Sequence, residues 1–159
     1  YEILENLSMI SASPISICII GAYGVSSKLS RLSSISNLDI HFFARLDPLD
    51  FYQKLSASKV IISIPISDSS PKSIYEAIYL KKPLFLTSLS CFDWIDNFKS
   101  YPVSYSTSDP KEDANLLNAM LVNQNQLSLL SQKYKYTPAF LKNLKFKEIA
   151  LQYFSIFAS

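Results

Sequence analysis

The sequence predicts an α/β protein whose strands form one doubly wound parallel sheet. Short β-branched runs alternate with segments of helical spacing over most of the 159 residues. This alternation is typical of parallel sheets that carry helices on both faces. Ligands of such sheets bind beyond the carboxyl ends of the strands. We therefore expect the site at an edge that collects Gly21 and the loops over residues 44–46, 68–73 and 88–90.

In the first half of the chain, helix-like segments alternate with two clear strand-like runs. The runs ISICII and LDIHFF are short and rich in isoleucine and phenylalanine, as expected of buried strands. Pro48 suits the first turn of a helix, where no backbone donor is needed. These patterns predict helices over 1–10, 26–35 and 48–56, and strands over 15–20 and 38–43.

The second half repeats the alternation and ends in helices. Ser90 and Asp109 are suitable capping residues for two of these helices. We expect strands over 60–64, 84–87 and 103–105, and helices over 73–82, 92–98 and 110–132. The chain is predicted to be a single domain over residues 1–159, with C-terminal helices over about 110–157.

Composition excludes several classes of function. The net charge of +2 is too small to indicate a nucleic-acid partner, and 48% hydrophobic residues indicate a folded core. Cys18 and Cys91 fall on elements expected to be buried and form no metal or disulfide pattern. His41 is expected to be packed or exposed at an edge rather than catalytic. No apolar run is long enough to span a membrane and no signal peptide is visible, so a cytoplasmic location is expected.

The candidate site lies in the stretch from residue 61 to residue 83. Ser70 can cap the helix that follows the third strand, and Pro71 suits its first turn. The free backbone amides around Lys72, Ser73 and Ile74 would form a phosphate site at the start of that helix.

Two carboxylates frame this phosphate site. Glu76 lies about one turn into the helix, from where it can reach a pair of hydroxyls such as those of a ribose. Asp68 lies eight positions earlier, in the loop at the carboxyl end of the strand. Spacing alone leaves two interpretations equally open: a ligand site, or a capping Asp in a loop followed by a Glu in solvent.

The same stretch resembles a motif of retaining glycosyltransferases of the GT-B fold. The residues SDSSPKSIYEAIYLKKP follow the form S-D-G-[ST]-x-x-S-[LI]-x-E-A-[MI]-x-x-[GK]-x-P of the glycosyl transferases group 1 family. The resemblance implies that Glu76 binds the donor's ribose and that the amides near Ser73 and Ile74 hold its diphosphate. It places Asp68 as the catalytic candidate, at the first acidic position of the E-x7-E motif, facing the donor sugar. Ser69 stands where the family usually has Gly.

The resemblance extends over most of the chain and implies a Rossmann-like fold, the C-terminal half of GT-B. Residues 15–21 resemble the family's strand that ends in Gly, which brings Gly21 into the site. Residues 40–46 resemble the segment whose loop contacts the base, and residues 141–157 resemble the family's C-terminal helix. The implied donor is a nucleotide diphosphate sugar, and no metal or other cofactor is expected.

Parts of the family pattern are absent from this chain. The resemblance implies an N-terminal acceptor domain and a first strand whose Arg and Lys neutralise the diphosphate. Arg45 and Lys72 could replace those cations only in part. We therefore expect a donor-binding half of a glycosyltransferase, inactive alone, whose glycan or lipid-linked acceptor is held elsewhere. The alternative is a non-catalytic α/β module that binds a nucleotide or a protein.

Lysines cluster near the C-terminus, and this cluster has two interpretations, one of which is contact with a membrane. Their first interpretation is the solvated face of a helix; the alternative is peripheral contact with the inner face of the membrane. The lysines are Lys133, Lys135, Lys142, Lys145 and Lys147.

Overall fold

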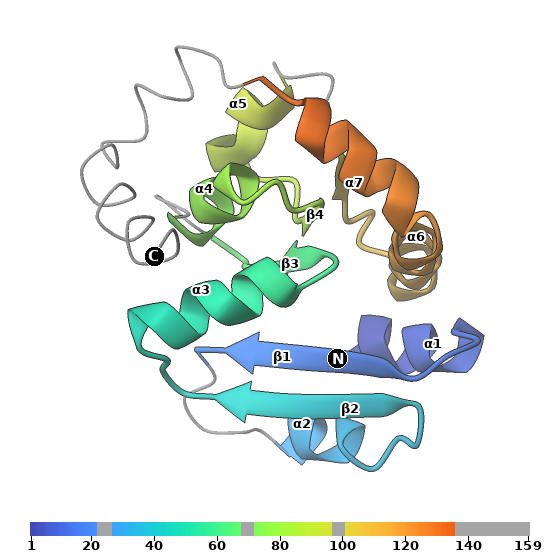
Figure 1. Ribbon diagram of the computed structural model, residues 1–159. Helices are drawn as coiled ribbons and strands as arrows, with labels where there is room; N and C mark the ends of the chain where they lie inside the picture. The colour runs from blue at the N-terminus through green and yellow to red at the C-terminus, as the bar shows by residue number, and fades with distance from the viewer. Residues whose placement is uncertain (22–26, 68–71, 97–100, 136–159) are drawn as a thin grey trace.

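The computed structural model describes residues 1–21, 27–67, 72–96 and 101–135, and has a mixed α/β architecture (Figure 1). Every strand pair in the described residues is parallel. The parallel α/β class predicted from the sequence is thus confirmed. The strands are β1 (Ile15–Ile20), β2 (Leu38–Phe43), β3 (Ile61–Ser63), β4 (Leu84–Leu86) and β5 (Val103–Tyr105).

The strands form two sheets rather than the single continuous sheet that we expected. β1 pairs with β2, in a register that sets Ile15 opposite Leu38. The second sheet has the order β3-β4-β5, with Ile61 opposite Leu84. Figure 1 shows β1 between β2 and the part of the molecule that holds β3 and β4.

The helices follow the predicted order, with one difference near the end of the described chain. The expected long helix over 110–132 is broken at Asn123, whose ψ of 23° is not helical. The helices are α1 (Glu2–Ile10), α2 (Ser27–Leu32), α3 (Pro48–Ala57), α4 (Lys72–Tyr79), α5 (Asp93–Asp96), α6 (Pro110–Val122) and α7 (Gln124–Lys133), with a 3₁₀ turn η1 (Ser90–Phe92) before α5. The helix expected over 141–157 lies outside the described residues.

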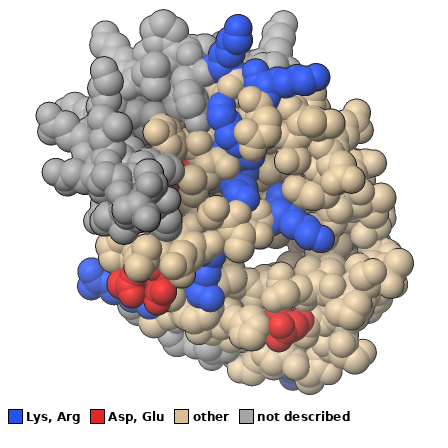
Figure 2. Space-filling model, in the orientation of Figure 1, with Lys and Arg blue, Asp and Glu red and all other residues tan. Residues whose placement is uncertain are grey.

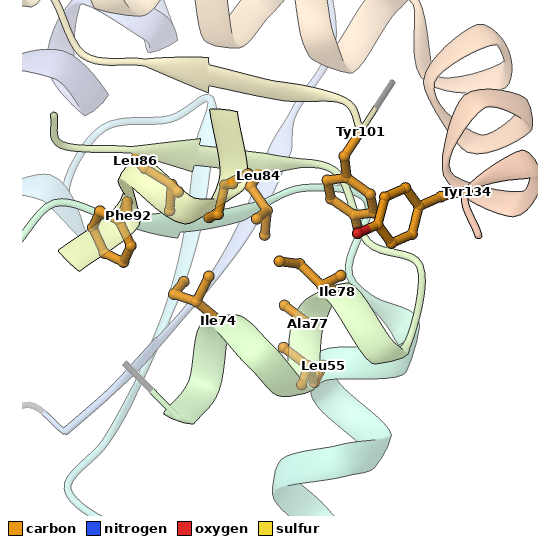
Figure 3. Close-up of a cluster of buried hydrophobic side chains, with 10 residues drawn as sticks. Leu55, Ile74, Ala77, Ile78, Leu84, Leu86, Phe92, Tyr101 and Tyr134 are labelled. Atoms are coloured by element: carbon orange, nitrogen blue, oxygen red, sulfur yellow. The ribbon is translucent and has the colours of Figure 1, made fainter. Parts of the chain in front are cut away.

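β4 lies at the centre of the core. Its three residues are 0% exposed, because successive side chains point to opposite faces and both faces are covered. Leu84 and Leu86 pack into a cluster with Ile74 and Ile78 of α4, which Figure 3 shows. Phe85 packs on the other side, in a cluster to which α1 and α6 contribute.

α3 contacts the two-stranded sheet on one side and α4, which packs on the three-stranded sheet, on the other. The helix begins at Pro48, and the Asp47 side chain caps it by accepting a 3.0 Å hydrogen bond from the Asp50 amide. Toward β2, the Lys54 ammonium lies 4.4 Å from the centroid of the Phe43 ring. Toward α4, the Tyr52 hydroxyl donates a hydrogen bond to the carboxylate of Glu76. α3 therefore links the two-stranded sheet to the helix that carries the candidate site.

The end of α4 is a Schellman motif built without glycine. The amides of Lys81 and Lys82 donate to the carbonyls of Ile78 and Ala77, at 2.9 Å each. Lys81 adopts the left-handed conformation that this motif requires, with φ at 59°. Its ammonium donates a 2.7 Å hydrogen bond to the Tyr134 carbonyl oxygen, which ties this turn to the end of α7.

The loop after β5 is fastened to α6 through a buried carboxylate. Asp113 is 1% exposed. One of its oxygens accepts from the Thr107 amide at 2.7 Å and from the Thr107 hydroxyl at 3.1 Å, and the other accepts from the Ser106 hydroxyl. Because several donors satisfy its oxygens, this carboxylate can be buried without an ion pair.

Candidate functional site

The first turn of α4 presents polar groups to solvent while anchoring itself in the core. Lys72 and Ser73 are exposed, whereas the Ile74 side chain is fully buried. The buried isoleucine fixes the rotation of the helix, so Lys72 and Ser73 face outward. The amides of this turn have no acceptor inside the helix, which is the general state of a helix start. The expected phosphate-binding amides therefore lie where the sequence predicted a helix start.

Glu76 lies on the same helix, half-buried between α4 and α3. The Tyr52 hydroxyl donates a 2.7 Å hydrogen bond to its Oε1. Among the residues that the structure describes, Oε2 has no hydrogen-bond partner. Glu76 is thus not a helix residue surrounded by solvent, which was one of the two interpretations that the spacing left open, but a carboxylate held on one oxygen by Tyr52.

The surroundings of Glu76 act on its pKa in opposite directions. Burial raises the pKa of the Glu76 carboxyl above its ordinary value and is the largest effect. The hydrogen bond from Tyr52 lowers this pKa, and so does the positive charge of Lys72, but together they do not offset burial. The carboxylate is therefore short of stabilising donors, a state that a ligand with hydroxyl groups would relieve.

Gly21 and Arg45 lie together at the carboxyl ends of the two-stranded sheet. The Gly21 amide donates a 2.9 Å hydrogen bond to the Phe43 carbonyl, the last residue of β2. Gly21 has φ at +86°, which favours glycine, and a Cβ placed on it would meet nothing within 4 Å. Arg45 is exposed in the loop that follows β2. A side chain or ligand group could therefore approach Gly21 at this end of the sheet.

The described site residues fall into two groups, one at each sheet. Lys72, Ser73, Ile74 and Glu76 share α4, whereas Gly21 and Arg45 belong to the ends of β1 and β2. α3 stands between the groups, since it contacts Phe43 through Lys54 and Glu76 through Tyr52.

Two of the predicted site residues belong to a segment that the structure does not describe. Asp68, the catalytic candidate, and Ser70, the expected cap of α4, lie outside the described residues. Their predicted roles therefore stay predictions.

Sequence reasoning missed Tyr52 as a member of the site. Tyr52 precedes Glu76 by 24 positions and lies on a different helix, so no local spacing connects them. The available signal was helical spacing within α3. Tyr52 lies three positions before the buried Leu55 and next to the partly buried Phe51, so it belongs to the inward-facing side of that helix.

His41 and Cys18 are both exposed on strands of the two-stranded sheet. His41 is exposed on β2 with its Nε2 3.0 Å from Oδ2 of Asp39, which confirms the edge-exposed interpretation. Cys18 is exposed on β1, so its expected burial was wrong; Cys91 is partly buried. Cys18 is exposed because β1 alternates between a partly covered and an open face, a pattern that its apolar composition did not reveal.

Within residues 1–21, 27–67, 72–96 and 101–135, no group of three or more His, Cys, Asp or Glu side chains could hold a metal ion. In the same ranges, no helix has the length and apolar character needed to cross a bilayer. Lys133 and Lys135 are exposed, and the other lysines of the predicted basic cluster lie outside these ranges.

Comparison with known proteins leaves the assignment to the chain's own chemistry. No family model, no curated protein and no solved structure matches the sequence or the structure.

Proposed function

We propose that this chain binds the donor of a retaining glycosyltransferase, as the C-terminal, Rossmann-like half of a GT-B enzyme. The donor would be a nucleotide diphosphate sugar, and the acceptor a glycan or a lipid-linked glycan held by another domain. The observation that carries this proposal is the Glu76 carboxylate, half-buried one turn inside α4 and held on one oxygen by Tyr52.

The chemistry of Glu76 suits a ribose. A ribose offers two neighbouring hydroxyls, and a carboxylate oxygen without a partner can accept from them. Burial raises the pKa of Glu76, so the free carboxylate is under-stabilised and new donors are favourable. Hydrogen bonds to a charged group contribute about 1.5–3 kcal/mol each.

The start of α4 suits the diphosphate of the same donor. Exposed Lys72 adds a positive charge to the amides of the first helical turn, and helix starts favour anions. Ser73 adds a hydroxyl donor at the same place. A phosphate at this turn and a ribose at Glu76 would lie about one helical turn apart, as the two parts of a nucleotide require.

Asp68 is proposed as the carboxylate that faces the donor sugar. This role rests on the family motif alone. Arg45, exposed after β2, is the proposed second cation at the diphosphate, and the space beside Gly21 would admit part of the nucleotide.

The proposal is tested by calorimetric titration with UDP, GDP and ADP sugars. We expect one of them to bind, and Glu76→Ala to weaken its affinity by at least about tenfold, the loss of one charged hydrogen bond. Glu112→Ala is the matched control, because Glu112 is an exposed glutamate in the first turn of a different helix, α6.

The alternative is a non-catalytic module that keeps the fold and binds a nucleotide or a protein. Its supporting observation is that exposed Lys72 is a cation at the start of α4, whereas exposed Arg45 follows β2 and belongs to the group of site residues on the other side of α3. Binding of free nucleotides without preference for any sugar would favour this alternative. Equal affinity in wild type and Glu76→Ala would overturn the site assignment in either case.

A further inference from the structure

The amino ends of the strands in the three-stranded sheet form an edge of their own. There the Ile61 amide donates to the Pro83 carbonyl at 2.9 Å, and the Leu84 amide donates to the Pro102 carbonyl at 3.0 Å. The candidate site at the start of α4 follows the carboxyl end of β3, so it belongs to the opposite edge of this sheet. The amino edge is therefore a separate surface.

Two lysines draw the ends of α3 and α7 to this amino edge. The Lys82 ammonium donates a hydrogen bond to the Ser56 carbonyl in the last turn of α3. The Lys81 ammonium donates at 2.7 Å to the carbonyl of Tyr134, the residue after α7. Both ammonium groups are thus held in place by the fold rather than free to move in solvent.

The chain segments that meet at this edge are strongly biased in charge. Residues 55–60, 80–83, 101–102 and 131–135 contain lysines but no Asp or Glu. In Figure 2, a band of Lys and Arg side chains runs from the top of the molecule, where Figure 1 shows the end of α7, toward its centre. The lysines of the four segments, which we call the basic row, are Lys59, Lys81, Lys82, Lys133 and Lys135.

The positive charge of the basic row is not neutralised by neighbouring side chains. Within the residues that the structure describes, no carboxylate forms an ion pair with Lys59, Lys82 or Lys135. Burial lowers the pKa of Lys81 and of Lys82, so the charged forms of these two side chains are under-stabilised. An anion beside them would relieve this, and the surface therefore favours an anionic partner.

The other side chains of the four segments indicate which anion fits. The aromatic residues there are Tyr101 and Tyr134, each only 6% exposed, so they offer no stacking platform to the bases of a nucleic acid. None of the large hydrophobic side chains that are exposed in the described chain lies in these segments, so the row has no apolar anchor for a bilayer. Carboxylates need neither feature.

We propose that the basic row binds an acidic polypeptide segment of a partner protein, which lies in extended form from the end of α3 to the end of α7. Asp and Glu side chains of that segment would pair with the lysine ammonium groups, and charge complementarity of this kind selects partners and speeds their encounter. The proposal goes beyond the proposed function and does not depend on it, because the donor groups lie at the other edge of the sheet.

The first experiment titrates the protein with a fluorescein-labelled peptide of about ten glutamates, which spans about 33 Å when extended, close to the width of a small domain. We expect binding at about 0.1 M salt and release at about 1 M salt, where charges interact over only about 3 Å. Fluorescence anisotropy measures the affinity. In an NMR titration of the wild type, the largest amide shifts should fall on the basic row.

A charge-reversed variant tests the row against net charge. Lys59→Glu combined with Lys133→Glu changes two exposed positions of the row. The matched control, Arg31→Glu combined with Lys111→Glu, reaches the same net charge at exposed positions on α2 and α6. At about 0.1 M salt, exposed charges more than about 10 Å apart are largely screened. We expect the row variant to weaken peptide binding at least about fivefold and the control less than about twofold.

Several outcomes would overturn the proposal. Equal weakening in the two variants would mean that net charge, not the row, attracts the peptide. Amide shifts located away from the row would do the same, and this readout uses the wild type alone. Vesicles of phosphatidylserine and phosphatidylcholine, and oligothymidylate, are tested in parallel. If one of them binds and the row variant loses that binding, while the peptide does not bind, the partner is a membrane or a nucleic acid instead.

Discussion

The Tyr52 hydroxyl on α3 donates a 2.7 Å hydrogen bond to Oε1 of Glu76 on α4. This bond joins the helix that contacts β2 to the helix that carries the candidate ligand groups. It also fixes which face of the Glu76 carboxylate is open to a ligand. Tyr52 is therefore a positioning residue, and its hydroxyl can be tested apart from its ring.

Tyr52→Phe should raise the pKa of Glu76 further. The hydroxyl is one of two groups that lower this pKa against the effect of burial, and phenylalanine keeps the ring but not the donor. The measurement is an NMR titration of the Glu76 side-chain carboxyl. Tyr1→Phe is the control, because it removes a hydroxyl 3.5 Å from another helical glutamate, Glu5. An unchanged or lower pKa of Glu76 would contradict this prediction.

Glu76→Gln should gain stability relative to wild type as pH rises. Because burial raises the pKa of Glu76 in the folded state, the native protein binds more protons than the unfolded chain between the ordinary and the raised pKa. The free energy of unfolding of the wild type therefore falls as pH increases through that window. Gln does not titrate, so the variant lacks this contribution to the pH dependence. Urea unfolding of both proteins at about pH 4 and about pH 7 measures it. A difference that does not change between the two pH values would argue against it.

Phe85→Ala should destabilise the protein by about 3–5 kcal/mol, the usual cost of removing a buried phenylalanine. Phe85 is 0% exposed on β4 and packs against α1 and α6. Thermal unfolding should show a midpoint lower by roughly 2–4 °C per kcal/mol for a chain of this size. Ile66→Ala is the control, because Ile66 is 98% exposed and its loss should change stability by less than about 0.5 kcal/mol.

Lys81→Gly should be more stable than Lys81→Ala by about 1 kcal/mol. Both variants lose the ammonium contact with the Tyr134 carbonyl, so the comparison isolates the backbone. At a φ of 59°, alanine retains the strain of a side chain in the left-handed region, whereas glycine does not. Urea unfolding of the two variants compares them. Equal stability would mean that α4 does not end in the left-handed turn.

Asp113→Ala should cost about 2–3 kcal/mol of stability. The change removes a buried acceptor and leaves the Thr107 amide and the Ser106 hydroxyl without their partner. Glu112→Ala, at the exposed neighbouring position, should be nearly neutral by the same unfolding measurement. A similar loss in both variants would indicate an effect of the helix start rather than of the buried network.

The sequence predicted individual elements better than their assembly. β1, β2 and β5 have the predicted boundaries to the residue, because each is a short β-branched or aromatic run between turn residues. Their division into two sheets was not predictable, since periodicity identifies a strand but not its neighbours. The break at Asn123 was also missed, because apolar residues continue at helical spacing on both sides of it.

The site was predicted in part for the same reason. Glu76, Lys72, Ser73 and Ile74 lie within one local segment, and their placement on α4 followed from the strand, loop and helix signals. The hydrogen bond from Tyr52 depends on how α3 packs against α4, which no local pattern encodes. Asp68 and Ser70 lie outside the described residues.

Among the described strands β3 is bonded only to β4, and its other edge has a consequence for handling the isolated chain. An exposed, uncharged isoleucine edge is a template on which strands of other molecules can assemble, and natural proteins often place lysine there to prevent it. Between Val60 and Ile66 no residue is charged, and Ile66 is almost fully exposed. At high concentration the chain should therefore aggregate through this edge, and Ile62→Lys should keep it in solution.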